Sequence, residues 1–437
     1  MKLITFFEHK KYEYKNLSPD PKEKIELTDS DKNQIDRINK KQKATIFNLG
    51  WKEIEATSYV GVIRCRNKTI QILPKLDFKE NGMEDKDKQK KQTATQNLLF
   101  LLSYTKKLTI KESEIASLTS KRDSFFEVLI YLFAKNLDEL LKKGIHRRYE
   151  VVEEKTGFLK GKWLITKQLR HHPISKHYFL VAYDEFTEDN LLNQILKFTI
   201  QCLLTVSESE GNKRLLRQLA FIFSDVSDKM ISSNDCKKFT FTRLIDAYKP
   251  VFNLAKLFIC DSSIQLSVGK VETFSLLFDM NKLFEEFIAE FIKKERILDN
   301  TDYNECEIIT QKRGEYLVYK NGIEGAFHLQ PDILFVSRNN DKECKLIIDT
   351  KYKRLETEKD VTSEDMYQMF AYSQRHNCPK VILLYPQWEK EVKKDYFVKE
   401  GNRKILICTV NLNRDLKKEK EELRNELNET LKGKIQD

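Results

Sequence analysis

Residues 345–355 read KLIIDTKYKRL, and this stretch decides how the C-terminal third of the chain is interpreted. Its apolar run at 346–348 is typical of a buried strand, and Asp349 follows the run at once. Lys351 comes two positions later, and residues two apart share one face of a strand. The pattern therefore predicts a carboxylate and an amine side by side at the end of a buried strand.

A second acid, Asp332, follows Pro331 and precedes another apolar run, ILFV. If the two strands form an adjacent antiparallel pair, the carboxylates of Asp332 and Asp349 meet at one point. Two such carboxylates repel each other unless a cation lies between them, and Mg²⁺ accepts one or two carboxylates together with water and phosphate oxygens. The ammonium of Lys351 would then orient the attacking water and neutralise charge on the phosphate. This chemistry is hydrolysis of a phosphodiester. The alternative is a turn at Asp332 and a surface ion pair at a strand end.

Helical patterns flank these strands. Residues 278–295 place apolar side chains on one face of a helix, and residues 363–376 form a second helix that Thr362 or Ser363 caps. A strand follows at 380–386, KVILLYP. The order helix, three strands, helix, strand predicts a mixed α/β arrangement around the acids.

With Pro331-Asp332 and Asp349-Thr350-Lys351, this region resembles the PD-(D/E)XK nucleases. The resemblance implies a further acid on the preceding helix, Glu285 with Glu286 as its rival, and adds the backbone carbonyl of Thr350 as a metal ligand. It also implies a role for Gln368 and Tyr372, which are spaced like the QxxxY element of the RecB-like branch. For each helical residue, an ordinary exposed helix surface is the alternative.

Four further segments, at 59–76, 157–169, 183–197 and 277–287, resemble the McrC family, nuclease subunits of McrBC-type restriction systems. The resemblance implies a Mg²⁺-dependent endonuclease, with Mn²⁺ as a substitute, that acts on double-stranded, modified DNA. It implies as partner a McrB-like AAA+ hexamer whose GTPase the chain stimulates, docked through the region before the nuclease. In the hairpin at 59–76, the partner contacts would be Arg64, Arg66 and Lys68, or these are exposed charges without a function.

The sequence thus predicts an α+β chain of several domains. We expect a β-containing N-terminal docking region at 1–95, with a charged loop at 77–95. A mostly helical middle region at 96–265 follows, with a basic extended segment at 147–173. The last region, 266–437, is expected to be a PD-(D/E)XK domain with a mixed sheet and a C-terminal amphipathic helix.

Composition sets the outer limits of this interpretation. The 437 residues carry a formal net charge of +10, which suits a polyanionic partner. The eight cysteines show no zinc-site spacing, and no signal peptide or membrane span is predicted, so we expect a cytoplasmic protein. No G-x-x-x-x-G-K-[ST] motif occurs, so we expect no nucleotide hydrolysis by this chain.

Two other functions stay open at this point. One is a regulatory subunit with a silent nuclease fold, and the other is a stand-alone repair nuclease of the RecB type. Three histidines are candidates for metal ligands or for neighbours of the site. His171 and His172 lack acidic or cysteine partners at ligand spacing and fit a loop role. His328 could share a strand face with Asp332, although a plain strand histidine is the simpler interpretation.

Overall fold

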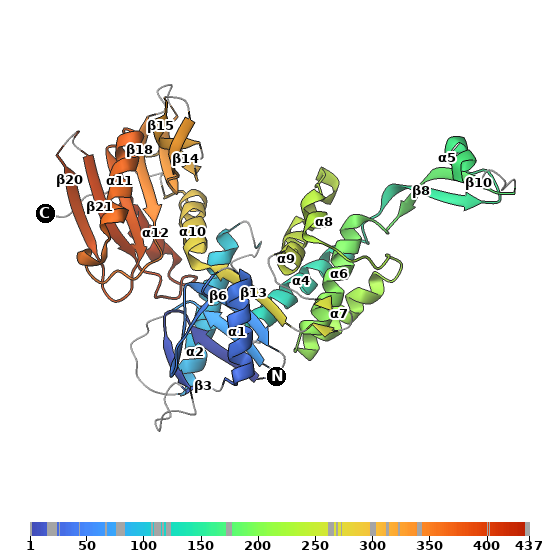
Figure 1. Ribbon diagram of the computed structural model, residues 1–437, viewed down its shortest axis with the longest axis horizontal. Helices are drawn as coiled ribbons and strands as arrows, with labels where there is room; N and C mark the ends of the chain where they lie inside the picture. Colours follow the sequence, from blue (N-terminus) through green and yellow to red (C-terminus); the bar gives the residue numbers. More distant parts are fainter. Residues whose placement is uncertain are drawn as a thin grey trace. The chain divides into compact units, whose positions relative to one another are not determined.

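The computed structural model describes residues 2–14, 24–25, 27–42, 44–65, 68–75, 84–105, 108, 115, 118, 124–171, 177–260, 266–267, 270–271, 273–297, 303–311, 314–321, 324–338, 343–399, 401 and 403–432. The chain divides into two compact units (Figure 1). The first unit combines Met1–Phe125 with Leu277–Asp437, and the second is Phe126–Leu276. The three consecutive regions expected from the sequence stay predictions.

The N-terminal part of the first unit contains two four-stranded sheets. The first has the order β1-β7-β6-β13, from Lys2–Phe7, Lys68–Leu73, Tyr59–Cys65 and Thr273–Asp279. The second has the order β3-β2-β5-β4, from Lys24–Ile25, Lys11–Tyr14, Glu53–Ala56 and Phe47–Leu49, with helix α1 (Asp29–Gln42) packed nearby. β6 and β7 pair antiparallel, which confirms the predicted hairpin. Its apolar residues, such as Ile63 and Ile70, are buried in one core cluster with Phe6 and Phe47.

The charged segment at 77–95 is mostly not a loop, which corrects that prediction. Helix α2 spans Glu84–Tyr104, and residues 76–83 lie outside the described part. The first turns of α2 are rich in Glu, Lys and Gln, which are strong helix formers despite their polarity. The helix then buries Leu98, Leu99 and Phe100. Its apolar C-terminal half therefore anchors a polar N-terminal half that composition alone suggested was irregular.

The C-terminal part of the first unit is built on a six-stranded sheet with the order β14-β17-β18-β19-β21-β20. Its strands are Cys306–Thr310, Ile333–Ser337, Cys344–Thr350, Lys380–Pro386, Arg403–Val410 and Lys393–Val398. β18, β19 and β21 run parallel, and the remaining neighbours pair antiparallel. The mixed α+β class is confirmed. The assignment of this sheet to the PD-(D/E)XK class stays a prediction.

Three helices pack on this sheet: α10 (Met280–Lys294), α11 (Ser363–Arg375) and α12 (Lys420–Lys432). α10 begins at the N-cap Asp279 and buries the apolar face expected from its spacing. α11 is capped by Thr362 and inserts Met369 and Tyr372 into the core cluster that contains Ile347. Because Ile347 and Asp349 share a face of β18, α11 covers the face on which Asp349 lies.

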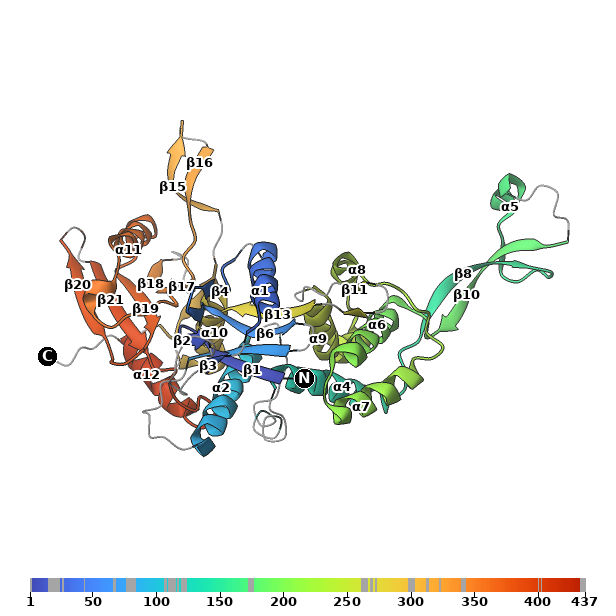
Figure 2. The same ribbon diagram turned by 60° about the horizontal axis from the view of Figure 1, so that its bottom comes forward.

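One segment departs from the expected strand order. The sequence 326–337, AFHLQPDILFVS, reads as a continuous strand-like segment, but in the structure it is divided at Gln330–Asp332. Its first part belongs to β16 (Glu324–Leu329), which pairs with β15 (Glu315–Lys320) in a separate hairpin. Figure 2 shows this hairpin projecting away from the six-stranded sheet. The break places Asp332 at the start of β17 rather than inside a strand.

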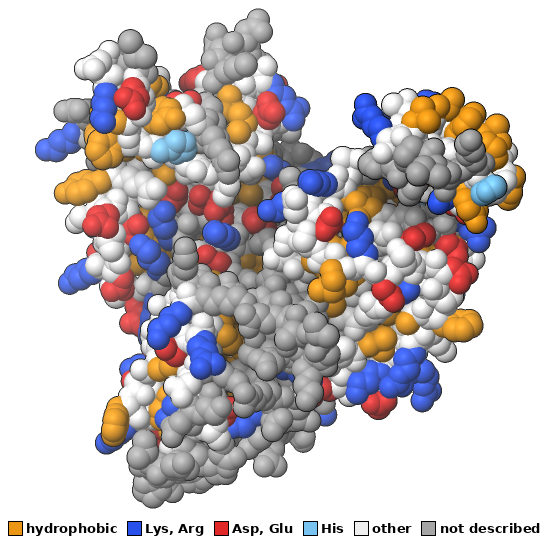
Figure 3. All heavy atoms as spheres, turned by 45° about the vertical axis from the view of Figure 1, so that its right-hand side comes forward, with side chains coloured by type: hydrophobic (Ala, Val, Ile, Leu, Met, Phe, Trp, Pro, Cys, Tyr) orange, Lys and Arg blue, Asp and Glu red, His pale blue; other side chains and the backbone are white. Residues whose placement is uncertain are grey.

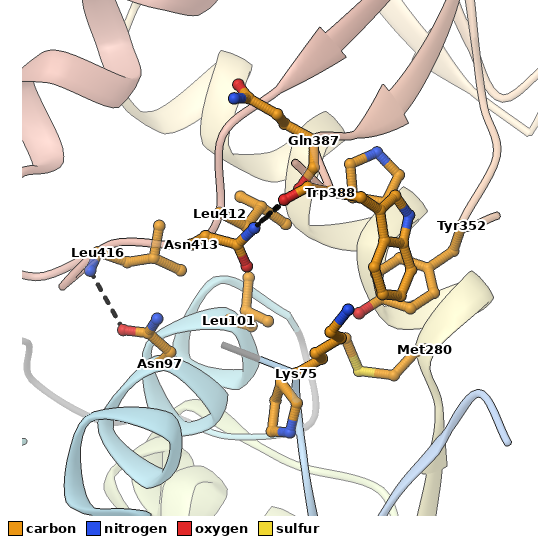
Figure 4. Close-up of a pocket in the computed structure, with 12 residues that line it drawn as sticks. Lys75, Asn97, Leu101, Met280, Tyr352, Gln387, Trp388, Leu412, Asn413 and Leu416 are labelled. Atoms are coloured by element: carbon orange, nitrogen blue, oxygen red, sulfur yellow. Dashed lines mark hydrogen bonds between the residues drawn. The ribbon is translucent and has the colours of Figure 1, made fainter. Parts of the chain in front are cut away.

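A small cavity of about 30 Å³ lies where the N-terminal part of the first unit meets the six-stranded sheet (Figure 4). Tyr352 and Trp388 line it from the sheet side, and Lys75 and Asn97 line it from the N-terminal side. Asn97 accepts a hydrogen bond from the Leu416 backbone, and the Lys75 ammonium lies 4.6 Å from the Trp388 ring centre. The cavity has room for a buried water.

The second unit combines a helical body with a projecting arm. The helices are α4 (Phe125–Leu141), α6 (Leu191–Val206), α7 (Glu210–Ile222), α8 (Ser233–Lys238), η1 (Arg243–Tyr248) and α9 (Lys249–Cys260), beside the short pair β11 (Leu266–Ser267) and β12 (Lys270–Val271). The arm is the sheet β8-β10-β9, from Arg148–Thr156, Phe179–Thr187 and Lys162–Trp163, with helix α5 (Ile165–His171). The basic segment 147–173 is therefore extended only in part, because its residues 165–171 form helix α5.

The arm carries exposed hydrophobic side chains, which gather at the upper right of Figure 3. They are Tyr149, Val151, Phe158, Leu159, Trp163, Ile165, Leu169, Tyr178 and Phe186. Exposed apolar surface of this extent marks interaction sites more often than it occurs by chance. In the part of the chain that the structure describes, no helix has the length and apolar character needed to cross a membrane.

Candidate active site

Asp332 and Asp349 lie opposite each other at one end of the paired strands β17 and β18. Ile333 is in register with Ile348, so the next pair in the same direction is Asp332 and Asp349. Oδ2 of Asp332 accepts hydrogen bonds from the Thr350 backbone N–H at 2.7 Å and from the Thr350 hydroxyl at 2.8 Å. The structure therefore brings together the two acids whose convergence the strand pattern predicted, and Thr350 fixes the position of Asp332.

Asp349 is a buried carboxylate held beside one cation. It is 1% exposed, and its Oδ2 is 2.7 Å from Nζ of Lys351. Oδ2 nevertheless makes no hydrogen bond of good geometry with any described residue. Burial, followed by the negative charge of Asp332, raises the pKa of Asp349 to about 7, although Lys351 opposes the rise. Asp349 is thus a carboxylate with too little positive charge around it.

Lys351 is fixed at the end of the strand by its backbone as well as by its side chain. Its backbone N–H donates to the carbonyl of Leu384 in the neighbouring strand at 2.9 Å. Burial works against the charged ammonium, but the ion pair with Asp349 outweighs burial and raises the pKa of Lys351. Lys351 is therefore positively charged at neutral pH and points toward the acids.

Helix α10 supplies the third acid, Glu285, rather than its neighbour Glu286. Glu285 lies within hydrogen-bonding reach of Asp332, and its Oε1 accepts from Nε2 of Gln311 at 2.5 Å. Burial, followed by the charge of Asp332, raises the pKa of Glu285 to about 7. Burial likewise raises the pKa of Asp332, against the hydrogen bonds from Thr350. Because the charge of Asp332 raises the pKa of both Glu285 and Asp349, the three acids share one electrostatic environment.

Gln368 and Tyr372 lie four residues apart on α11 and contact each other. Nε2 of Gln368 donates to the Tyr372 hydroxyl at 2.7 Å, and that hydroxyl donates to the carbonyl of Gln330 at 3.1 Å. Burial raises the pKa of Tyr372, and the charges of Asp349 and Asp332 add to the rise. By this hydrogen bond to Gln330, Gln368 and Tyr372 fix the backbone segment that contains Asp332.

Two further residues of the site were missed in the sequence. Gln311 has a left-handed backbone, with φ of 47°, and its N–H donates to the carbonyl of Asp332 at 2.9 Å. Asp365 is buried between Nζ of Lys353, at 3.2 Å, and the Tyr385 hydroxyl, at 3.3 Å. Asp365 precedes Gln368 by three residues on one helical face, which was a usable signal. No local pattern indicated Gln311, since tertiary folding alone brings it to Glu285.

The remaining candidates lie elsewhere. His328 belongs to the projecting hairpin, where its ring packs edge-on against Tyr316 at 5.4 Å. His171 ends helix α5 on the arm, and His172 lies outside the described residues, as does Arg66. Arg64 lies in β6 and Lys68 in β7, and Lys68 forms an ion pair with Asp31 at 2.5 Å. None of the four described residues among these, His328, His171, Arg64 and Lys68, belongs to the acid cluster.

The carboxylate and carbonyl oxygens of this site suit a small divalent cation that prefers oxygen ligands. Within the described residues, no three His, Cys, Asp or Glu side chains form a ready metal cage. Mg²⁺ does not require one, because it keeps several waters and takes one or two carboxylates. Oδ2 of Asp349 has the Lys351 ammonium as an ion-pair partner but no hydrogen bond of good geometry among the described residues, which leaves this oxygen able to bind a cation. Asp332 and Asp349 therefore fit Mg²⁺, with the Thr350 carbonyl as a predicted third ligand.

The comparisons with known proteins agree with one another. A family model described as "McrBC 5-methylcytosine restriction system component" matches residues 54–386. A curated relative, the Type IV methyl-directed restriction enzyme EcoKMcrBC of Escherichia coli (strain K12), is 23% identical over 336 residues. That alignment covers 73% of this chain and 92% of the relative.

Two solved structures are also similar. One chain comes from the refined half-complex of a tetradecameric assembly of Thermococcus gammatolerans McrB AAA+ hexamers with bound McrC. It matches with a TM-score of 0.67 and 24% identity over 98% of this chain and 100% of its own length, which shows a shared fold. A chain of the Thermococcus gammatolerans McrBC complex matches with a TM-score of 0.49 and 28% identity over 68% of this chain and 88% of its own. Because the family model spans most of the 437 residues, the chain belongs to the McrBC 5-methylcytosine restriction system component family.

Proposed function

We propose that this chain is the nuclease subunit of its restriction system and hydrolyses DNA phosphodiesters with Mg²⁺. The observation that carries the proposal is the convergence of Asp332, Asp349 and Lys351 at the end of β17 and β18. Glu285 from α10 adds a third carboxylate beside Asp332. These groups are the ones that phosphodiester hydrolysis needs. Asp332, Asp349 and Lys351 lie at the ends of β17 and β18, and Glu285 lies on α10.

Each residue has a distinct part in this proposal. Asp332, Asp349 and the Thr350 carbonyl would hold Mg²⁺, or Mn²⁺ in its place, and Glu285 would bind it directly or through water. When bound, the metal would polarise the phosphate and lower the pKa of a coordinated water. Lys351 orients the water and stabilises the negative charge that develops on the phosphate oxygens. Gln368 steadies the Asp332 segment through Tyr372 and Gln330.

The partner in this proposal is a McrB-like AAA+ GTPase hexamer. Support comes from the similar chain, which belongs to an assembly of McrB AAA+ hexamers with bound McrC. The 437 residues contain no G-x-x-x-x-G-K-[ST] motif, which fits a division of labour in which the partner hydrolyses GTP. The expected docking hairpin at 59–76 is largely buried in a sheet. The exposed apolar side chains of the arm make it the better docking candidate.

A reconstitution experiment tests this function. The full chain is assayed with its partner, GTP and Mg²⁺ on methylated and unmethylated duplexes, with each component left out in turn. Cleavage of methylated DNA that needs partner, GTP and Mg²⁺ supports the proposal. Cleavage by the chain without partner or GTP would instead indicate a stand-alone nuclease. Stimulated GTP hydrolysis without any cleavage would indicate a silent regulatory subunit.

A further inference from the structure

The β15–β16 hairpin is anchored in the candidate active site at both of its ends. On the β15 side, Gln311 contacts the side chain of Glu285 and the backbone of Asp332. On the β16 side, the carbonyl of Gln330 accepts from the Tyr372 hydroxyl. The base of this hairpin therefore lies beside the acids.

The hairpin carries exposed apolar side chains, although Leu329 at its base belongs to the core cluster that contains Ile347. Leu317, Val318, Tyr319 and Phe327 are all exposed, and Phe327 is exposed by 75%. A free two-stranded hairpin is only marginally stable in water. Exposed apolar side chains that cluster on such a hairpin indicate a binding surface. The core that would bury them is not supplied by the described part of this unit.

Phe327 has a special place within the hairpin. The register runs from the pair Tyr316–His328 to the pair Val318–Ala326, and Phe327 between them has a left-handed backbone with φ of 56°. A bulky residue in that conformation is strained, and such strain collects at binding and catalytic sites. The strained backbone therefore marks an exposed ring five residues before Asp332.

Other contacts brace the hairpin as a defined platform. A Cβ on Gly325 would lie 2.4 Å from the Tyr316 ring, so only glycine lets that ring pack on the strand. Nη2 of Arg375, in α11, donates to the Tyr319 hydroxyl at 3.0 Å, and Arg375 Nε lies 3.5 Å from Glu315. The hairpin is thus braced on the helix that also carries Gln368 and Tyr372.

We propose that the β15–β16 hairpin binds duplex DNA beside the active site and that the Phe327 ring wedges against a base step. This rests on the proposed nuclease function, which makes DNA the molecule that lies against the hairpin base. Apolar side chains inserted between base steps unstack the bases. Lys320 in β15 and Arg375 in α11, which donates to Tyr319 of β15, supply positive charge for the DNA phosphates. Five residues span at most about 17 Å. With the lengths of the side chains added, the unstacked step therefore lies within about one turn of the duplex, roughly ten base pairs, of the scissile phosphate.

The test uses the full chain with Lys351→Ala, so that the DNA stays intact, together with its partner, GTP and Mg²⁺. Methylated duplexes carry 2-aminopurine at successive positions, and binding and fluorescence are measured on the same samples. Phe327→Ala and Phe327→Gly should abolish the fluorescence rise near the cleavage position and weaken DNA binding about tenfold, as loss of one stacked ring does. Phe327→Leu should keep part of both signals.

Two controls separate the wedge from the fold and from other surfaces. Glycine accepts a positive φ without strain, so Phe327→Gly should keep or raise the melting temperature while losing the wedge. Phe397, in β20, is 72% exposed on the same unit, and Phe397→Ala should leave binding and fluorescence unchanged.

Unchanged DNA binding and 2-aminopurine fluorescence in Phe327→Gly would overturn the proposal. The proposal would also be overturned if Phe327→Gly abolished self-association of the chain and left DNA binding unchanged, because the hairpin would then join copies of the chain. Cleavage by the chain that retains Lys351 is measured in parallel. If this chain cleaves DNA and the Phe327→Gly variant still gives the 2-aminopurine fluorescence rise, the hairpin proposal fails and the nuclease proposal stands. If no variant cleaves or binds DNA, the nuclease proposal fails first.

Discussion

Asp349 shows what the site requires at the scale of one residue. Its carboxylate is buried, lies opposite Asp332 and, among the described residues, forms an ion pair with Lys351. Burial, followed by the charge of Asp332, raises the pKa of Asp349 and of Glu285 to about 7, so these two carboxyls partly retain protons near neutral pH, and burial also raises the pKa of Asp332. A divalent cation would displace those protons, so metal binding and proton release should be coupled.

The coupling predicts how stability depends on pH. The folded pKa values of Asp349 and Glu285, about 7, lie above the unfolded values of 3.8 and 4.5, so the folded state binds more protons between those limits. Without metal, the melting temperature should therefore fall as pH rises from about 4 to 7 and then level off. Glu8, with a pKa raised to about 7 by burial, contributes in the same range.

Mg²⁺ should reverse this trend. At pH 8 it should raise the melting temperature, and the rise should shrink below about pH 6, where protons compete for the carboxylates. Thermal melts at several pH values, with Mg²⁺ or with chelator, measure both effects. Asp349→Asn should reduce the Mg²⁺ effect, whereas Glu8→Gln should leave it intact. A Mg²⁺ effect of equal size at pH 5 and pH 8 would argue against carboxylate ligands.

At the scale of elements, some parts of the site were readable from sequence and others were not. The apolar spacing of α10 and α11 and the strand run before Asp349 predicted those elements, because each buries one face on the sheet. Asp349 and Lys351 followed from the two-residue period of a strand. Glu285 and Gln368 entered through resemblance, since many helix acids and amides look alike.

The elements that sequence missed depend on tertiary structure. The first turns of α2 are polar on all sides and are stabilised by the buried half of the same helix. The break between β16 and β17 is set by Gln330, whose carbonyl is held by Tyr372 from α11. Gln311 reaches Glu285 across 26 positions of sequence. No local pattern encodes such contacts.

A buried hydrogen bond joins the N-terminal part of the first unit to the segment that follows β18. The Tyr352 hydroxyl, next to Lys351 in the chain, donates to the buried carboxyl of Glu8, which also accepts from the Lys75 backbone. Tyr352→Phe should lower the free energy of unfolding by about 1–3 kcal/mol, because Glu8 loses a buried partner. Urea unfolding followed by tryptophan fluorescence measures the loss, and Tyr396→Phe, on a half-exposed side chain, is the matched control. Equal stability of both variants would mean that the contact contributes nothing.

At the scale of the whole molecule, the two units suggest two tasks. The first unit holds the acids, and the second carries an arm with exposed apolar side chains. We expect that Phe158→Ser combined with Leu169→Ser abolishes stimulation of the partner's GTPase, because these side chains leave water on docking. Leu244→Ser, at a residue 93% exposed outside the arm, is the control. Full stimulation by the arm variant would move the docking surface elsewhere.

The most direct test of the central claim compares Lys351→Ala and Asp349→Ala with the unmodified chain in one reconstituted assay. DNA cleavage and GTP hydrolysis by the partner are measured in the same reactions with Mg²⁺. The acid–lysine site predicts that both variants lose cleavage while stimulated GTP hydrolysis and the melting transition persist. Cleavage at the unmodified rate by either variant would contradict the assignment of catalysis to this site.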